Sequence, residues 1–185
     1  MEIIRRYYNA MCDYKKELCS RQMCERIEMM MQKLDLNPKE REVINVALEK
    51  QKEENKNIVS IELPNGKIIT GKETKLLSAS SAMLINALKE ITKIPDDVYL
   101  LSPTVLEAIL KTKKETSYRT SYSLNVQEVL IALSICASNN PIIENVIGNI
   151  GKLRGQEAHS TYIIEKSEMN VLKNLGINLT CEPNM

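Results

Sequence analysis

The sequence has 185 residues, in which 25 Lys and Arg stand against 24 Asp and Glu, so its formal net charge is +1. This balance disfavours a dedicated nucleic-acid-binding protein, because such proteins usually carry a clear basic excess. A single His excludes a His-rich zinc site or an H-E-x-x-H protease within this chain. Apolar residues make up 43% and charged residues 26%, which is typical of a globular protein with one domain, or one domain and an appendage.

The sequence favours a cytoplasmic protein with reduced thiols. It contains no run of 18 apolar residues, and its N-terminus carries charges where a secretion signal would have an apolar core. The cysteines are odd in number and none is spaced as C-x-x-C; they are Cys12, Cys19, Cys24, Cys136 and Cys181. We expect small buried side chains rather than a metal or redox site.

Residues 1–56 are predicted to form a helical subdomain. Apolar residues recur at spacings of three and four from Ile3 to Leu18, and again from Met23 to Leu34, as in two amphipathic helices. The segment Asn37-Pro38-Lys39-Glu40 has the residues of a capping box, with proline at the first helical position. It predicts the start of a third helix that continues to about residue 54.

Residues 57–185 are predicted to form an α/β subdomain with a mixed sheet. An Asn-Gly turn at 64–66 joins the first two of the expected strands, which are 58–63, 67–70, 98–101, 157–164 and 177–180. A polar loop is expected at 111–123. Cap residues and apolar periodicity predict helices at 78–93, from 103, from 125, at 141–153 and at 167–176. Alternating strands and helices indicate a layered α/β fold.

The first candidate site consists of Glu157, His159 and Cys181. Glu157 and His159 are two residues apart on a predicted strand, so their side chains share one face. An imidazole beside a carboxylate can act as a general base, and a nearby thiol can be activated as a thiolate. The alternative is a paired His and a packed Cys without a catalytic role. A zinc deaminase site is excluded, because the segment has too few ligands for one.

The second candidate is an anion site at Gly151, Lys152, Arg154 and Gly155. Glycines beside basic side chains can expose backbone N–H groups to an anion. The segment is not a Walker A loop, because Leu153 stands where a Ser or Thr would bind Mg²⁺. The alternative is an ordinary helix C-terminus, in which glycine ends the helix and the basic residues complement its dipole.

Two further features have simple structural explanations beside the functional ones. Three hydroxyls, of Ser78, Ser80 and Ser81, stand at a predicted helix N-terminus, where they favour either capping or phosphate binding. The basic run from Lys111 to Arg119 has the charge to contact nucleic acid, although such a run is usually a solvated face.

Several strings of the sequence together resemble a known bacterial family. They lie at 3–10, 128–136, 152–155, 157–161 and 175–183. The chain looks like the C-terminal part of the uncharacterised protein family 0371, also described by the domain of unknown function 1846. Two positions depart from the family pattern: Gln156 stands where a Cys usually precedes Glu-Ala-His, and Ser78 where a Gly is common.

The resemblance implies a longer parent protein. Its N-terminal region would be Rossmann-like, with a glycine-rich, phosphate-loop-like segment that is absent from this chain. The C-terminal subdomain would be a three-layer α/β/α unit that resembles the cytidine deaminase topology without its zinc site. We therefore expect a structural or assembly role, with the missing region or a second copy as partner, and no cofactor or metal in this chain. The alternative is a small-molecule or anion-binding enzyme domain, in which Lys152 and Arg154 hold an anion near Glu157, His159 and Cys181.

Overall fold

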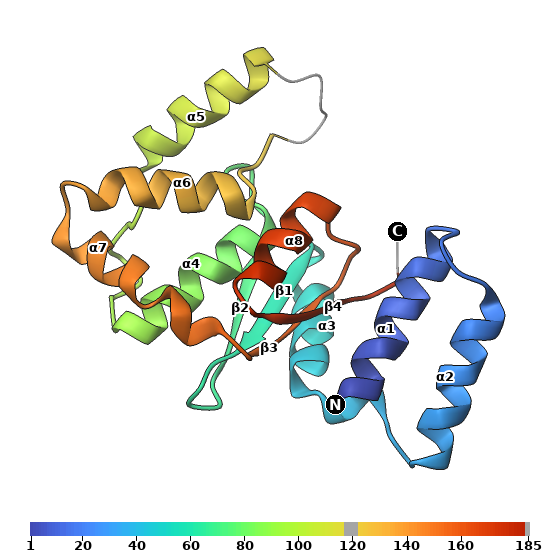
Figure 1. The fold of residues 1–185 in the computed structure, drawn as a ribbon. Coiled ribbons are helices and arrows are strands. Elements are labelled where there is room, and N and C mark those ends of the chain that lie inside the picture. Colours follow the sequence, from blue (N-terminus) through green and yellow to red (C-terminus); the bar gives the residue numbers. More distant parts are fainter. Residues whose placement is uncertain (117–121, 184–185) are drawn as a thin grey trace.

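The computed structural model describes residues 1–116 and 122–183, which form a mixed α/β protein with eight α-helices and a four-stranded sheet (Figure 1). The strands lie in the order β2-β1-β3-β4. Strand β1 is antiparallel to β2 and to β3, whereas β3 and β4 are parallel. Their bounds are Ile58–Glu62 (β1), Ile68–Lys72 (β2), Glu157–Ser160 (β3) and Asn178–Cys181 (β4). The predicted mixed sheet is confirmed.

Two of the three strand connections follow from the local sequence and the strand pairing. Gly66 takes a φ of +80° in the turn between β1 and β2, as the Asn-Gly pair predicts. Helix α8 (Lys166–Asn174) joins the parallel strands β3 and β4, because parallel neighbours need a crossover rather than a hairpin. The strand predicted at 157–164 ends early, at Ser160, where the Ser160 hydroxyl donates to the carbonyl of Tyr162 and the chain turns.

Helices α1 (Glu2–Lys15) and α3 (Glu42–Glu54) pack on one face of the sheet, and α2 (Arg21–Lys33) packs on α1. A short 3-10 turn at Pro38–Glu40 precedes α3. The capping box of Asn37 and Glu40 is present, but it caps the 3-10 turn, and α3 starts only at Glu42. Arg41 separates the two in an extended conformation and directs its side chain toward the sheet.

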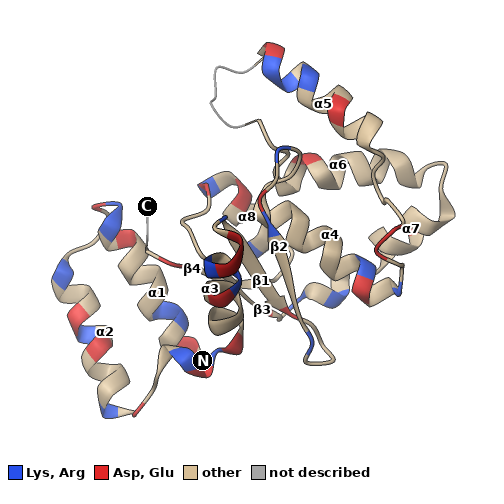
Figure 2. Ribbon diagram, turned by 180° about the vertical axis from the view of Figure 1, so that it is seen from behind, with Lys and Arg blue, Asp and Glu red and all other residues tan. Residues whose placement is uncertain are grey.

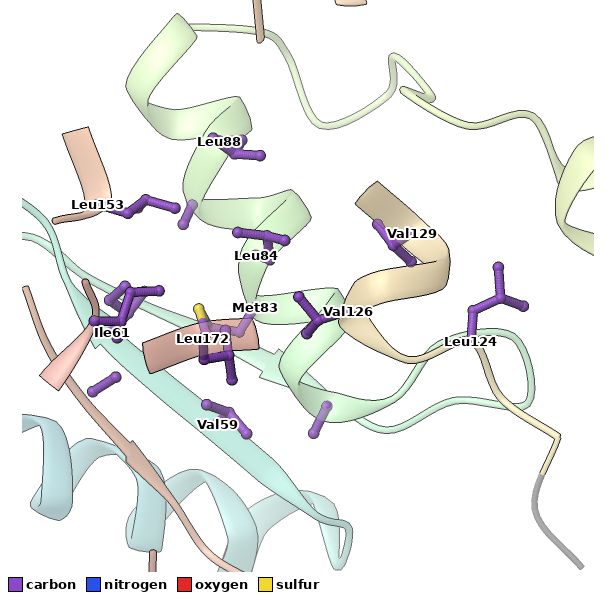
Figure 3. Packing of buried hydrophobic residues seen from close by; sticks show 14 of the residues in the cluster. Val59, Ile61, Met83, Leu84, Leu88, Leu124, Val126, Val129, Leu153 and Leu172 are labelled. Atoms are coloured by element: carbon purple, nitrogen blue, oxygen red, sulfur yellow. The ribbon is translucent and has the colours of Figure 1, made fainter. Parts of the chain in front are cut away.

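The opposite face of the sheet carries the larger core. Because side chains alternate along a strand, Val59, Ile61 and Ala158 point away from the face that bears Ser60 and His159. They pack with Met83 and Leu84 of α4 (Ala79–Thr92) and with Leu172 of α8 (Figure 3). A smaller cluster joins the N-terminal helices and consists of Ile4, Tyr8, Met31, Val43 and Ile44.

The remaining helices lie on the far side of α4 from the sheet (Figure 1), and Figure 2 shows the same arrangement from behind. They are α5 (Pro103–Thr116), α6 (Val126–Ala137) and α7 (Pro141–Gly148), followed by a 3-10 turn at Ile150–Leu153. Three predictions here were wrong. Residues 98–101 form no strand, since Leu100 and Leu101 are buried without a ladder partner. The expected loop from Lys111 is helical to Thr116, and the helix expected to reach Leu153 ends at Gly148.

None of the helices formed by the described residues has both the length and the apolar character needed to cross a membrane.

Candidate functional site

A buried polar cluster lies between the sheet and the N-terminal helices, and Arg41 is at its centre. The guanidinium is fully buried; Nη1 donates to Thr180 Oγ1 at 2.6 Å and Nη2 to Glu157 Oε2 at 2.8 Å. Nη2 also approaches the carbonyls of Ala158 and Asn178, at 3.2 and 3.4 Å. Such a buried charge requires a partner, because an isolated ion away from water is very costly.

The Glu157 carboxylate forms ion pairs with two arginines that come from different helical segments. Arg5 of α1 forms an ion pair with Oε1, while Arg41, just before α3, binds Oε2. The amide of Asn178 on β4 donates to Oε1 at 3.0 Å. One carboxylate on β3 therefore ties α1, the start of α3 and β4 together.

The His159 ring is completely buried and both its nitrogens have partners. Nδ1 lies 2.9 Å from Thr180 Oγ1, and Nε2 lies 3.1 Å from Glu182 Oε1. A carboxylate only accepts, so Nε2 carries the ring proton and donates to Glu182, and Nδ1 of the neutral ring accepts from the Thr180 hydroxyl. Tyr8 packs its ring edge-on against the imidazole, with the centroids 5.0 Å apart.

Burial sets the protonation of this cluster. It lowers the pKa of His159 below its ordinary value, against the smaller opposing effect of Glu182, so the ring is neutral at pH 7. Burial likewise raises the pKa of the Tyr8 hydroxyl. Both ring nitrogens of His159 are bound by side chains of the chain itself, and the ring has no exposed surface in this structure.

The structure does not bring Cys181 to His159. In the register of β3 and β4, His159 pairs with Thr180 and Ser160 pairs with Cys181, so the thiol points to the opposite face of the sheet. Burial raises the pKa of Cys181, which opposes thiolate formation. Glu157 and His159 share a face as expected, whereas the three candidates do not converge on one site; a catalytic role for them stays a prediction.

In the Gly151–Gly155 segment, several backbone N–H groups are engaged within the chain. Those of Lys152, Arg154 and Gly155 donate to the carbonyls of Asn149, Gly151 and Gly176, respectively. The side chains of Lys152 and Arg154 are exposed. An anion site here would depend on these two side chains, and it stays a prediction.

The N-terminus of α4 already holds a carboxylate from the chain itself. Ser78 caps the helix by accepting from the N–H of Ser81, and its hydroxyl lies 2.7 Å from Glu168 Oε1. The same oxygen accepts from the N–H of Val126 at the start of α6. Burial raises the pKa of Glu168. This geometry fits capping rather than capture of an external phosphate.

Only part of the basic run from Lys111 to Arg119 lies within the residues that the structure describes. Lys113 forms an ion pair with Glu128 at 2.7 Å, and Lys111 to Glu115 lie on α5. Tyr118 and Arg119 lie outside the described residues.

Two residues of the buried cluster carried little sequence signal. Arg41 is one Arg or Lys among 25, and nothing in its spacing indicates burial. Glu182 follows Cys181 in a string that stands out only for its Cys. Among the described residues, no group of three His, Cys, Asp or Glu side chains is placed to hold a metal ion.

These features define a mixed α/β domain with a largely buried polar cluster that joins its helices to its sheet. A family model described as domain of unknown function DUF1846, C-terminal, matches residues 39–185, and the chain belongs to this family. It is 40% identical to a UPF0371 protein of Clostridium botulinum (strain Eklund 17B / Type B) over 191 residues, and 38% identical to one of Clostridioides difficile (strain 630) over 190. These alignments cover 99% and 98% of this chain, which spans only 38% of the length of either relative.

Proposed function

We propose that this chain is the C-terminal assembly region of a larger bacterial cytoplasmic protein and packs against the rest of that protein or a second copy of itself. The observation that carries the proposal is the coverage: nearly the whole chain matches, yet it spans only 38% of its relatives. The remainder would include the Rossmann-like, nucleotide-binding N-terminal region that the family resemblance implies. The same proposal includes, for residues 57–185, a three-layer α/β/α arrangement that resembles the cytidine deaminase topology.

The surface of α2 supports this role. Met23, Met30 and Leu34 are 49%, 47% and 56% exposed and recur at positions i, i+7 and i+11, so they form one stripe, which we call the α2 stripe. On the neighbouring side of the same helix, Cys24 and Met31 are buried against the domain. The apolar face of α2 is therefore wider than the domain covers, as expected of a surface made for a further partner.

Calorimetric titration tests the proposal. The 185-residue chain is titrated with the part of the C. botulinum relative that lies outside the match, and we expect saturable binding at one to one. The triple variant Met23→Gln, Met30→Gln, Leu34→Gln should lose the binding, whereas Arg26→Gln, an exposed change on the same helix, should retain it. Self-association that the triple variant abolishes would identify a second copy as the partner. A strict monomer that binds neither, or a triple variant that binds normally, contradicts the proposal.

A further inference from the structure

A groove of about 620 Å³ opens between α1 and α8. Its floor includes Cys12 and Cys181, and Met169 of α8 lines one wall. The Cys12 thiol donates to the Cys181 carbonyl at 3.2 Å, which closes the floor. A volume of this size lies within the usual range of small-molecule sites, about 300–1,000 Å³.

The place of the groove in the sheet favours a ligand. Cys181 is the last residue of β4, and Ile163 and Ile164 lie just beyond the end of β3, so the groove lies beyond the carboxyl ends of the two parallel strands. In open α/β sheets, ligands bind in the crevice outside these ends. Figure 1 shows β4 reaching α1 below α8, in agreement with the packing of both helices on this strand.

The charges of the groove favour an anion. Lys16 follows α1, and Lys166 and Lys173 stand on α8, while the acidic residues are Asp13 and Glu165. Lys16 and Lys173 line opposite walls of the groove. Both lower the pKa of the Cys181 thiol against the larger effect of burial, so both charges act electrostatically on the floor. The floor itself is mainly apolar.

We propose that this groove binds a small molecule in which one anionic head group, a carboxylate or a phosphate, is joined to an apolar body. The head group lies between Lys16 and Lys173, and the body lies over Met169 toward the floor. The site includes no residue of the α2 stripe and does not use the His159 cluster. It therefore goes beyond the proposed assembly role, and a test of one proposal does not decide the other.

The test follows the methyl signal of Met169 by NMR in the full 185-residue chain labelled with ¹³C-methyl methionine, assigned through Met169→Leu. Hexanoate and hexyl phosphate are the probes, with hexanol and inorganic phosphate as controls lacking the head group or the body. We expect hexanoate, hexyl phosphate or both to shift this signal saturably in about the millimolar range. The tighter of the two identifies the head group, and both controls should bind more weakly.

Variants that remove the charges of the two lysines test where the head group binds. Lys16→Gln with Lys173→Gln should weaken the binding about fivefold or more, because each removes one exposed ion pair with the probe. Lys33→Gln, an exposed change on α2, is the matched control and should leave it unchanged. All three changes lie on the surface, so the fold should persist. The proposal is overturned by a Met169 signal that no probe moves, by hexanol binding as tightly as the tighter of the two anionic probes, or by a double variant that binds normally.

Discussion

Arg41 Nη2 lies 2.8 Å from Glu157 Oε2, although 116 positions separate these residues in the chain. The pair joins the segment before α3 to β3 in the middle of the sheet. Its guanidinium is fully buried and makes further hydrogen bonds to β4, so it belongs to the interior. The geometry around it is that of a structural tie, because both terminal nitrogens of the buried guanidinium bind side chains of the sheet.

His159 gives this cluster a defined pH dependence. Because burial lowers its folded-state pKa below the ordinary value of 6.5, the unfolded chain binds the proton more readily. The stabilisation is complete above about pH 6.5 and is lost as the pH falls through this value toward the folded-state pKa. Urea midpoints measured between pH 7.5 and 5.5 should fall in the wild type. His159→Gln should flatten that part of the profile, and an unchanged slope would contradict the assignment of a neutral buried ring.

The buried thiols should resist alkylation. Burial raises the pKa of Cys12 to about 12 and also raises the pKa values of Cys24 and Cys181. With iodoacetamide at pH 8, mass spectrometry should find modification of the half-buried Cys19 and Cys136 first, and of the other three only in denaturant. Rapid native modification of Cys181 would instead revive it as a reactive thiol.

Gly71 marks a close contact between β2 and α4. A Cβ added there would lie 1.9 Å from the backbone nitrogen of Met83 and 2.5 Å from the carbonyl oxygen of Ala79. Neither backbone atom can move away alone, so Gly71→Ala should lower the free energy of unfolding by about 1–3 kcal/mol or more. Urea denaturation measures this change.

Gly148 provides the matched control for this substitution. It closes α7, its φ is not positive, and the space that an added Cβ would occupy is open. Gly148→Ala should therefore be neutral or stabilise the protein by up to about 1 kcal/mol. Equal costs at both glycines would contradict the close contact between β2 and α4.

Local signals predicted the local structure well. The Asn65-Gly66 turn and the Asn125 and Glu128 capping box are present because their hydrogen bonds involve neighbouring residues. The strand expected at 98–101 is absent because an apolar run is buried equally well without a ladder.

The candidate site was predictable only in part. Side chains alternate along a strand, so the spacing of two residues correctly predicted that Glu157 and His159 share one face. This prediction needs only the strand that contains both residues. The separation of Cys181 from His159 depends on the register between β3 and β4, which no spacing along the chain specifies. The burial of Arg41 was unpredictable for a similar reason, because it depends on partners more than 100 positions away.

The account of the buried polar cluster as a structural tie depends most on the pair of Arg41 and Glu157. A double-mutant cycle with Arg41→Met and Glu157→Gln, followed by urea denaturation at pH 7.5, measures it directly. Glu157→Gln should cost about 3–5 kcal/mol, because it leaves the fully buried Arg41 without a counter-charge. Arg41→Met should cost less, because Arg5 and Asn178 still bind the Glu157 carboxylate. The double variant should cost less than their sum by about 1–3 kcal/mol. Single changes that each cost under about 0.5 kcal/mol, or costs that simply add, would contradict the tie.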